Sequence, residues 1–377
     1  MDRNLRAGLV EDLKRKIVLI TGPRQCGKTT LSKMLDDENQ YLSYDLVEHR
    51  LLIERKLWDR SKRLVIFDEL HKMDHWKSWI KGIYDVEGIP PALLVTGSAR
   101  LEAFRRTGDS LAGRHFTVRL HPIDLKEALA HTDFDAEEIF SRLLTVGGFP
   151  EPFLNGRRSY YNRWKRAHID VVIKEDLLTL TAVRDIQKIE TLIEMLRSRV
   201  GSPVSVNSLA EDLQKSPNTI LHWLGLLEDL YVIFKVPPYH RNIARALLKQ
   251  SKYYFYDNGM VQGDEGTKFE NLVACALLKE IHRLEDVEGE NMDLRFIRDK
   301  SAREVDFLVL KSHKPIHMIE AKWADSSLSA NLTRFLQNQS IQRTQVVAEL
   351  RTPMSTVTGE RIVPGKEFLS ELPIAKT

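Results

Sequence analysis

The chain has 377 residues, enough for two or three domains, and 42% of them are hydrophobic, enough for buried cores. Its 56 lysines and arginines nearly balance its 53 aspartates and glutamates, so the formal net charge of +3 does not by itself demand a nucleic-acid partner. Two cysteines exclude a disulfide framework, and we find neither an apolar stretch of membrane-spanning length nor an apolar signal region at residues 1–10, so we predict a cytoplasmic protein with no membrane partner.

The first predicted element is a buried strand over residues 17–20 that leads directly into a glycine-rich loop. Residues 22–29 are GPRQCGKT, which fits the phosphate-binding pattern G-x-x-x-x-G-K-[ST]. Lys28 is expected to reach the β- and γ-phosphates of ATP, and Thr29 is expected to ligate Mg²⁺. The alternative is an ordinary glycine-rich turn between a strand and a helix. We predict ATP contacts from nine residues: Gly22, Pro23, Arg24, Gln25, Cys26, Gly27, Lys28, Thr29 and Thr30.

A second strand is predicted over residues 63–69, where an apolar run ends in Asp68 and Glu69. Parallel sheets place their functional residues at the carboxyl ends of strands. Asp68 is therefore expected to hold the magnesium shell, and Glu69 is expected to orient and deprotonate the attacking water. The alternative is that both acids cap a helix that begins near Leu70.

Two histidines and two tryptophans follow this strand. His71 and His75 have helical i,i+4 spacing, but no glutamate follows the first histidine, so the zinc-peptidase motif is absent. We interpret both as surface histidines, and we interpret Trp76 and Trp79 as packing residues.

A third strand is predicted over residues 92–98, with small hydroxyl residues at its end. Ser98 or Thr96 could reach the γ-phosphate from this neighbouring strand. Arg114 follows shortly after and could contact phosphate in its own subunit or across the interface of a homo-oligomer, where it would stabilise charge in the transition state. The alternative is a surface arginine that pairs with a carboxylate.

The middle of the chain has helical periodicity up to about residue 200, followed by a small unit with the order strand, helix, turn, helix, strand. Ser208 and Glu211 predict a capping box for its first helix, and this order is typical of a winged helix. The second helix would present Asn218, Thr219 and His222 but contains no lysine or arginine. Packing or dimerisation is therefore the alternative to DNA binding. The nearest basic residues are Arg241, Arg245, Lys249 and Lys252.

The last third of the chain contains a second set of candidate catalytic residues. Strand periodicity places Glu304 and Asp306 on one face of a predicted strand, and it places Glu320 and Lys322 on one face of the next. Asp306 and Glu320 would bridge a metal, Glu270 would join them from a helix, and Lys322 would position water or stabilise the pentavalent phosphate. The alternative is a salt-bridged strand pair on a solvated sheet face.

Nine segments carry a resemblance to a prokaryotic family that joins an AAA-type ATPase domain to a C-terminal domain of unknown function. They are GPRQCGKTT, RLVIFDEL, LLVTGSARL, SLAGRHFTVRLHPID, VGGFPEPF, KYYFYDNGM, GTKFENLVACALL, REVDFLV and MIEAKW. The last three together resemble the PD-(D/E)xK nuclease signature, with Asp306, Glu320 and Lys322 as its core, Glu270 as its upstream acid, and Val305 in place of a proline. The arginine of LAGR, Arg114, resembles the phosphate-sensing or finger arginine of that family.

The resemblance implies an α/β protein with four parts. These are an AAA-type P-loop ATPase domain with a parallel sheet (residues 1–133), a helical lid or linker (134–200), a winged helix (201–240) and a restriction-endonuclease-like domain (241–377). The leading hypothesis is an Mg²⁺-dependent ATPase coupled to nucleic-acid binding, with DNA favoured, and to a nuclease-like site. The alternatives are an ATP-driven signalling or interaction switch with an inactive nuclease-like scaffold, and a chaperone-like ATPase that remodels proteins.

Overall fold

The computed structural model describes residues 1–97, 111–172, 177, 185–239, 250–336, 341–356 and 359–374. Ser98 lies outside the described residues, as do Arg241, Arg245 and Lys249. The chain divides into two compact units. The first consists of Met1–Pro122 with Asp229–Tyr231, and the second consists of Ile123–Glu228 with Val232–Thr377. The first unit thus ends before residue 133, where we placed the domain boundary.

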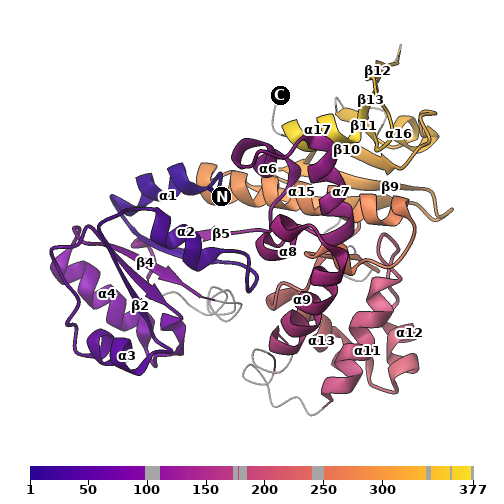
Figure 1. Ribbon diagram of the computed structural model, residues 1–377. Helices are drawn as coiled ribbons and strands as arrows, with labels where there is room; N and C mark the ends of the chain where they lie inside the picture. Colours follow the sequence, from indigo (N-terminus) through magenta and orange to yellow (C-terminus); the bar gives the residue numbers. More distant parts are fainter. Residues whose placement is uncertain are drawn as a thin grey trace. The chain divides into compact units, whose positions relative to one another are not determined.

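The first unit is built on a five-stranded sheet in which every strand pair is parallel, with the order β2-β3-β4-β1-β5 (Figure 1). Its strands are β1 (Ile17–Thr21), β2 (Asn39–Ser43), β3 (Leu64–Asp68), β4 (Ala92–Thr96) and β5 (His115–Arg119). Its helices are α1 (Arg6–Leu13), α2 (Lys28–Met34), α3 (Val47–Glu54), the 3₁₀ turn η1 (Leu70–Lys72) and α4 (Trp76–Glu87). All five residues of β1 are buried, as expected for a central parallel strand covered on both faces.

Aromatic side chains fill much of the core of this unit. Trp58, Phe67 and Trp79 pack edge to face, with ring centroids 5.4–5.7 Å apart, and Trp76 is buried in the same cluster. The packing role predicted for Trp76 and Trp79 is therefore confirmed. The prediction of a surface His71 is wrong, because η1 buries this ring at the carboxyl end of β3.

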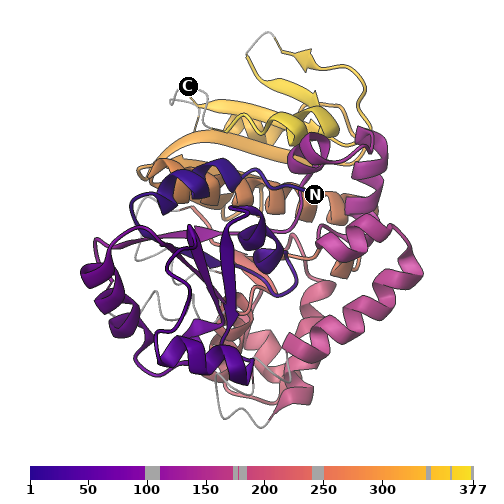
Figure 2. The same cartoon turned by 60° about the vertical axis from the view of Figure 1, so that its left-hand side comes forward.

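The second unit begins with a group of helices and continues into a six-stranded sheet (Figure 2). The helices are α6 (Leu125–His131), α7 (Ala136–Val146), α8 (Pro150–Asn155), α9 (Arg158–Val171), α11 (Ile186–Arg197), α12 (Val206–Leu213) and α13 (Pro217–Asp229). The helical periodicity predicted for this part of the chain is present in α11, whose buried face consists of Ile189, Leu192, Ile193 and Leu196. None of the helices in the described part of the chain is both long and apolar enough to cross a membrane.

Two of the segments that carry the family resemblance pack against each other in this unit. A Cβ on Gly147 would lie 2.1 Å from Oδ1 of Asp257, and one on Gly259 would lie 2.5 Å from the Tyr161 ring. The hydroxyl of Tyr161 donates a hydrogen bond of 2.8 Å to Oδ2 of Asp257. Burial raises the pKa of Asp257 to about 6. The glycines of VGGFPEPF and KYYFYDNGM therefore allow close approach around a buried carboxyl group.

The helix pair α12–α13 is followed by a two-stranded antiparallel ribbon, β6 (Ile233–Val236) and β7 (Lys252–Phe255). The predicted strand over residues 204–206 is reduced to an isolated bridge between Pro203 and Lys252. The predicted capping box is wrong, because α12 begins earlier and Ser205 accepts the hydrogen bond from the backbone N–H of Ser208. These elements have the order predicted for a winged helix, and that assignment stays a prediction.

The six-stranded sheet has the order β12-β13-β11-β10-β9-β8, and the long helix α15 packs on it (Figures 1 and 2). Its elements are η3 (Asn258–Met260), α15 (Glu265–Glu288), β8 (Met292–Arg298), β9 (Glu304–Lys311), β10 (Lys314–Lys322), α16 (Ala330–Arg334), β11 (Gln342–Val347), β12 (Met354–Ser355), β13 (Arg361–Pro364) and α17 (Gly365–Glu371). The helix expected to carry Glu270 is α15, which buries Leu272, Val273, Ala276 and Leu277. Strands β8, β11, β12 and β13 were not predicted.

Candidate functional site

The loop between β1 and α2 has the backbone shape that its glycines predict. Gly22 and Gly27 have φ values of 138° and 96°, in the region that favours glycine, and Gln25 shares it at 61°. A Cβ on Gly22 would lie 2.2 Å from the carbonyl oxygen of Leu120, so a larger residue cannot be accommodated there without moving the backbone. The chain is thereby turned sharply at the carboxyl end of β1, where a phosphate-binding loop has to lie.

Lys28 is the first residue of α2 and is only 8% exposed. Its Nζ donates hydrogen bonds of 2.9 Å to the carbonyl oxygen of Gly22 and 2.7 Å to that of Pro23. The ammonium group is therefore folded over the loop, at the place where phosphate oxygens would compete for it.

Asp68 ends β3 and gathers three hydroxyl groups from neighbouring elements. Its Oδ2 accepts a hydrogen bond of 3.2 Å from Oγ1 of Thr29, and further bonds come from the hydroxyls of Tyr41 on β2 and Thr96 on β4. A hydroxyl and a carboxylate oxygen are the hard ligands that Mg²⁺ prefers, and nucleotide sites need few protein ligands because phosphates and waters supply the others. Thr29 and Asp68 thus fit the expected magnesium site.

Glu69 follows β3 in a left-handed backbone conformation, with φ of 57°. Its N–H donates a hydrogen bond of 2.9 Å to the carbonyl oxygen of Thr96. Its Oε2 lies 3.5 Å from Nε2 of His71 and 3.6 Å from Nζ of Lys72. Burial raises the pKa of the Glu69 carboxyl, the charge of Lys72 acts against this, and the charge of Asp68 adds to it. Such a carboxylate binds protons more readily than an exposed one, as suits a general base.

Arg114 lies away from this group. It precedes β5, whose register pairs His115 with Ile17 and Arg119 with Thr21, so Arg114 is at the amino edge of the sheet while the loop follows the carboxyl edge. A five-residue strand separates the two edges by roughly 17 Å. Nε of Arg114 instead lies 2.7 Å from Oδ1 of Asp85. The structure therefore does not bring Arg114 to the loop of its own subunit, and Arg119 is the β5 arginine at the carboxyl edge.

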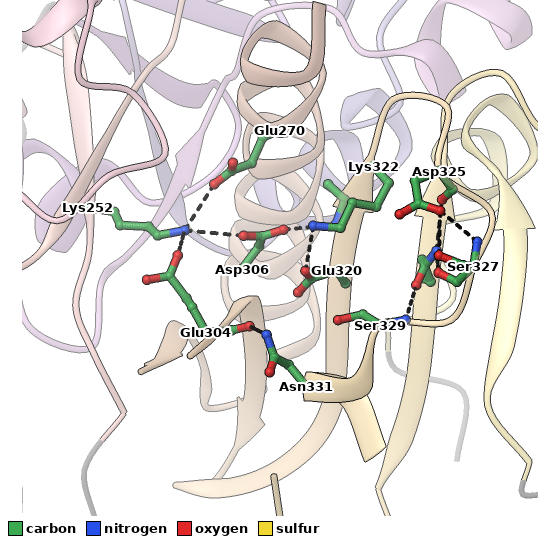
Figure 3. Close-up of polar contacts among 12 residues, drawn as sticks. Lys252, Glu270, Glu304, Asp306, Glu320, Lys322, Asp325, Ser327, Ser329 and Asn331 are labelled. Carbon is green, nitrogen blue, oxygen red and sulfur yellow. Dashed lines mark hydrogen bonds and ion pairs between the residues drawn. The ribbon is translucent and has the colours of Figure 1, made fainter. Parts of the chain in front are cut away.

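The second candidate site lies where β9 and β10 run side by side. Phe307 and Ile319 are paired across the two antiparallel strands; Asp306 directly precedes Phe307 on β9, and Glu320 directly follows Ile319 on β10. Oδ2 of Asp306 accepts a hydrogen bond of 3.0 Å from the N–H of Ala321 (Figure 3). Nζ of Lys322 lies 2.8 Å from Oε1 of Glu320. The structure thus brings together the three core residues of the predicted nuclease signature.

Lys252, the first residue of β7, also reaches this site. Its Nζ lies 2.6 Å from Oε1 of Glu304, 3.1 Å from Oε1 of Glu270 and 3.4 Å from Oδ1 of Asp306 (Figure 3). We call these three acids the carboxylate cluster. Lys252 is 0% exposed, so it is not one of the basic residues that a DNA helix could contact. In the sequence, Lys252 lies beside the predicted winged helix, far from Glu304 and Asp306, and its spacing gives no indication of this role.

The acids of the expected magnesium site, Glu270, Asp306 and Glu320, are paired with lysines, and the metal site stays a prediction. No group of three or more His, Cys, Asp or Glu side chains is arranged to hold a metal ion among the residues that the structure describes. The physical reason is that the acids turn toward lysines. Lys252 lies among Glu270, Glu304 and Asp306, and Lys322 pairs with Glu320. The repulsion that a metal was expected to relieve is relieved by ammonium groups.

Two carboxyl groups at this site nevertheless bind protons unusually tightly. Burial, followed by the charge of Asp306, raises the pKa of Glu270 and that of Glu320 to about 7. Both causes disfavour the ionised form, and the neighbouring lysines offset them only in part. The site therefore carries more negative charge at pH 8 than at pH 5.

The free energy of unfolding of Glu320→Gln, relative to that of the wild type, is expected to be greater at about pH 8 than at about pH 5. The folded pKa of about 7 lies above the ordinary 4.5, so the folded state binds more protons than the unfolded state, and the stability that depends on this carboxyl falls as pH rises between them. Glutamine is neutral at both pH values. The measurement is the free energy of unfolding in urea, with Glu371→Gln on the exposed end of α17 as control. The same difference at both pH values would contradict the raised pKa.

The sequence contains only weak indications of the positions that Glu304 and Lys252 take at this site. Strand periodicity places Glu304 on the same face as Asp306 but does not assign it a role at the site. Lys252 precedes a run of four aromatic residues, Tyr253 to Tyr256, which indicates that β7 is buried but not which acids its first residue meets.

Comparison with known families agrees with parts of these predictions. Residues 14–129 match a family described as an AAA domain, residues 137–265 match a domain of unknown function (DUF8612), and residues 265–376 match another (DUF4143). The chain therefore contains an AAA-type P-loop ATPase-like domain, whose five-stranded parallel sheet confirms the predicted α/β class, and a C-terminal domain of unknown function.

Similar proteins occur in distant organisms. An uncharacterized protein of Methanocaldococcus jannaschii is 24% identical over 340 residues, which cover 81% of this chain and 74% of that protein. An uncharacterized protein of Mycobacterium tuberculosis is 24% identical over 367 residues, which cover 94% of this chain and 81% of that protein. Among solved structures, a RuvB of Thermotoga maritima aligns with 62% of this chain and 89% of its own, at 16% identity and a TM-score of 0.32.

Proposed function

We propose that this chain binds and hydrolyses ATP at the carboxyl edge of the five-stranded sheet. The observation that carries the proposal is the meeting of Lys28, Thr29, Asp68 and Glu69 at this edge, with Thr96 linking the ends of β3 and β4. A cation for phosphate, two oxygen ligands for Mg²⁺ and a buried carboxylate are the parts that phosphoryl transfer to water requires.

Each residue has a distinct role in the proposed reaction. Lys28 would exchange its two carbonyl partners for phosphate oxygens, which are stronger acceptors because they are charged. Thr29 and Asp68 would hold Mg²⁺, which when bound neutralises phosphate charge. Glu69 would orient a water molecule and accept its proton, helped by its raised pKa.

Lys28→Ala is expected to weaken ATP binding by at least about tenfold, because it removes charge-assisted hydrogen bonds worth roughly 1.5–3 kcal/mol. ATP binding is measured by titration calorimetry on the intact chain. Lys33→Ala is the matched control, since Lys33 lies on the exposed side of the same helix. Equal affinities for Lys28→Ala and the wild type would contradict the proposed phosphate contact.

For the second unit we favour a scaffold that responds to the ATP cycle, as in the interaction-switch hypothesis, over an active nuclease. Supporting this choice, Lys252 lies among the acids that would otherwise bind a metal. The exposed side of α13 presents Asn218, Leu221 and His222 and has no lysine or arginine. Because contacts with nucleic-acid phosphates need positive charge, this helix does not support nucleic acid as a partner.

Metal-dependent cleavage remains the second candidate function, favoured by the proximity of Asp306, Glu320 and Lys322. We expect no cleavage of plasmid or single-stranded DNA with Mg²⁺ or Mn²⁺, with or without ATP, that exceeds the background of Asp306→Ala. The measurement is gel analysis of the products formed by the two proteins side by side. Cleavage by the wild type that is lost in Asp306→Ala would restore the nuclease hypothesis.

A further inference from the structure

We infer that the ammonium group of Lys252, and not a divalent metal ion, is the central cation of the carboxylate cluster. Its Nζ is within 3.4 Å of all three acids of the cluster. The close-up shows these acids converging on Lys252 from α15 and β9 (Figure 3). A lysine with no exposed surface needs such partners, because an unpaired buried charge is strongly disfavoured.

The backbone holds Lys252 in this position. Lys252 pairs with Val236 on β6 and forms an isolated bridge with Pro203, so its main chain is fixed from both sides. The ammonium group also lies 5.5 Å from the centre of the Phe296 ring. The side chain is therefore delivered to the cluster by a strand that lies outside the six-stranded sheet, and it does not depend on a flexible surface segment.

Glu270 has little room for a hydrated metal. Its Oε1 accepts hydrogen bonds of 2.7 Å from the Tyr254 hydroxyl and 3.1 Å from Lys252. On the other side, a Cβ on Gly201 would lie 2.7 Å from its Oε2. Mg²⁺ is bound with several of its waters in place, and the Tyr254 hydroxyl and the Lys252 ammonium group already occupy Oε1 of Glu270.

The remaining acids are also paired within the protein. Oε2 of Glu304 lies 2.9 Å from Nη1 of Arg298, and Oδ2 of Asp306 accepts the N–H of Ala321. With the Lys322–Glu320 pair, four carboxylates face three cationic side chains. A divalent ion would have to displace Lys252, because the charge that would attract it is already largely compensated.

Lys252 consequently acts as a built-in substitute for a metal ion. It ties the ribbon β6–β7 to α15 and β9 whatever the metal concentration, and it occupies the position from which a metal would activate water for attack on a phosphodiester. This role is independent of ATP hydrolysis in the first unit.

The test counts bound Mn²⁺ by electron paramagnetic resonance on the intact, nucleotide-free chain, with Mn²⁺ alone as the probe. Wild type and Asp306→Ala are expected to bind equal amounts, since any ion held by the first unit is common to both. Lys252→Ala is expected to bind about one additional Mn²⁺ per chain, and Lys252→Ala combined with Asp306→Ala is expected to lose it. Lys235→Ala, on the exposed side of the same ribbon, is the matched control.

Two results would overturn the inference. One is Mn²⁺ binding by the wild type that disappears in Asp306→Ala, which would make the cluster a metal site with Lys252 in place. The other is a folded Lys252→Ala protein that gains no Asp306-dependent ion. Should Lys252→Ala fail to fold, the comparison of wild type with Asp306→Ala still tests the inference. Equal Mn²⁺ binding by the two proteins supports Lys252 as the cation of the cluster, and weaker binding by Asp306→Ala contradicts it.

Discussion

Glu69→Gln is expected to lower the rate of ATP hydrolysis by about 100-fold or more while leaving ATP binding in place. Glutamine keeps the size and hydrogen-bonding capacity of glutamate but cannot accept a proton from water. The main chain of residue 69 is held by its hydrogen bond to Thr96, so the substitution changes the chemistry without moving the strand end. Phosphate release in single-turnover experiments gives the rate, and titration calorimetry gives the affinity.

The dependence of the hydrolysis rate on pH distinguishes a catalytic role of Glu69 from a purely structural one. Glu69 must be ionised to act as a base, and burial raises its pKa, so the wild-type rate is expected to rise with pH through that raised value and the Glu69→Gln rate is not. Glu48→Gln, an exposed acid in the first turn of α3, is the control and is expected to behave as wild type. An unaltered hydrolysis rate in Glu69→Gln would remove the assignment of Glu69 as base.

Lys252→Met is expected to lower the free energy of unfolding by roughly 3–5 kcal/mol at neutral pH. Methionine has nearly the length of lysine and fills the buried channel, but it leaves Glu270, Glu304 and Asp306 without their shared cation. Removing one partner of a buried ion pair costs more than the pair contributes, because the remaining charges stay buried. Urea denaturation of the intact chain, monitored by a spectroscopic signal from the second unit, measures the loss of unfolding free energy.

Two comparisons separate charge from packing in this experiment. The loss is expected to shrink at about pH 5, because burial raises the pKa of Glu270 to about 7 and this carboxyl group takes up a proton there, whereas a packing defect would be insensitive to pH. Lys235→Met, on the exposed side of β6, is expected to change stability by no more than about 0.5 kcal/mol. A Lys252→Met protein as stable as the Lys235→Met control would show that the cluster does not need its lysine.

Local sequence was sufficient to find most of the elements that position both sites. The loop of residues 22–29, the strand ending in Asp68 and the strand that carries Asp306 were each predicted and are each present. Such elements can be predicted because hydrophobic periodicity and turn residues act over a few neighbouring positions. Strands β11 and β13 escaped prediction because their apolar residues are limited to two in succession, Val346–Val347 and Ile362–Val363, which show no strand period.

Local spacing is enough to predict a phosphate-binding loop after β1 and acids at the end of β3. Periodicity also places Asp306 on one strand and Glu320 with Lys322 on one face of the next, whereas the pairing of these two strands depends on contacts between them. Only the tertiary structure decided that Arg114 is at the opposite edge from the loop and that Lys252 is the cation of the carboxylate cluster. The physical reason is that strand order and register set which side chains meet, and these depend on contacts between residues far apart in the chain.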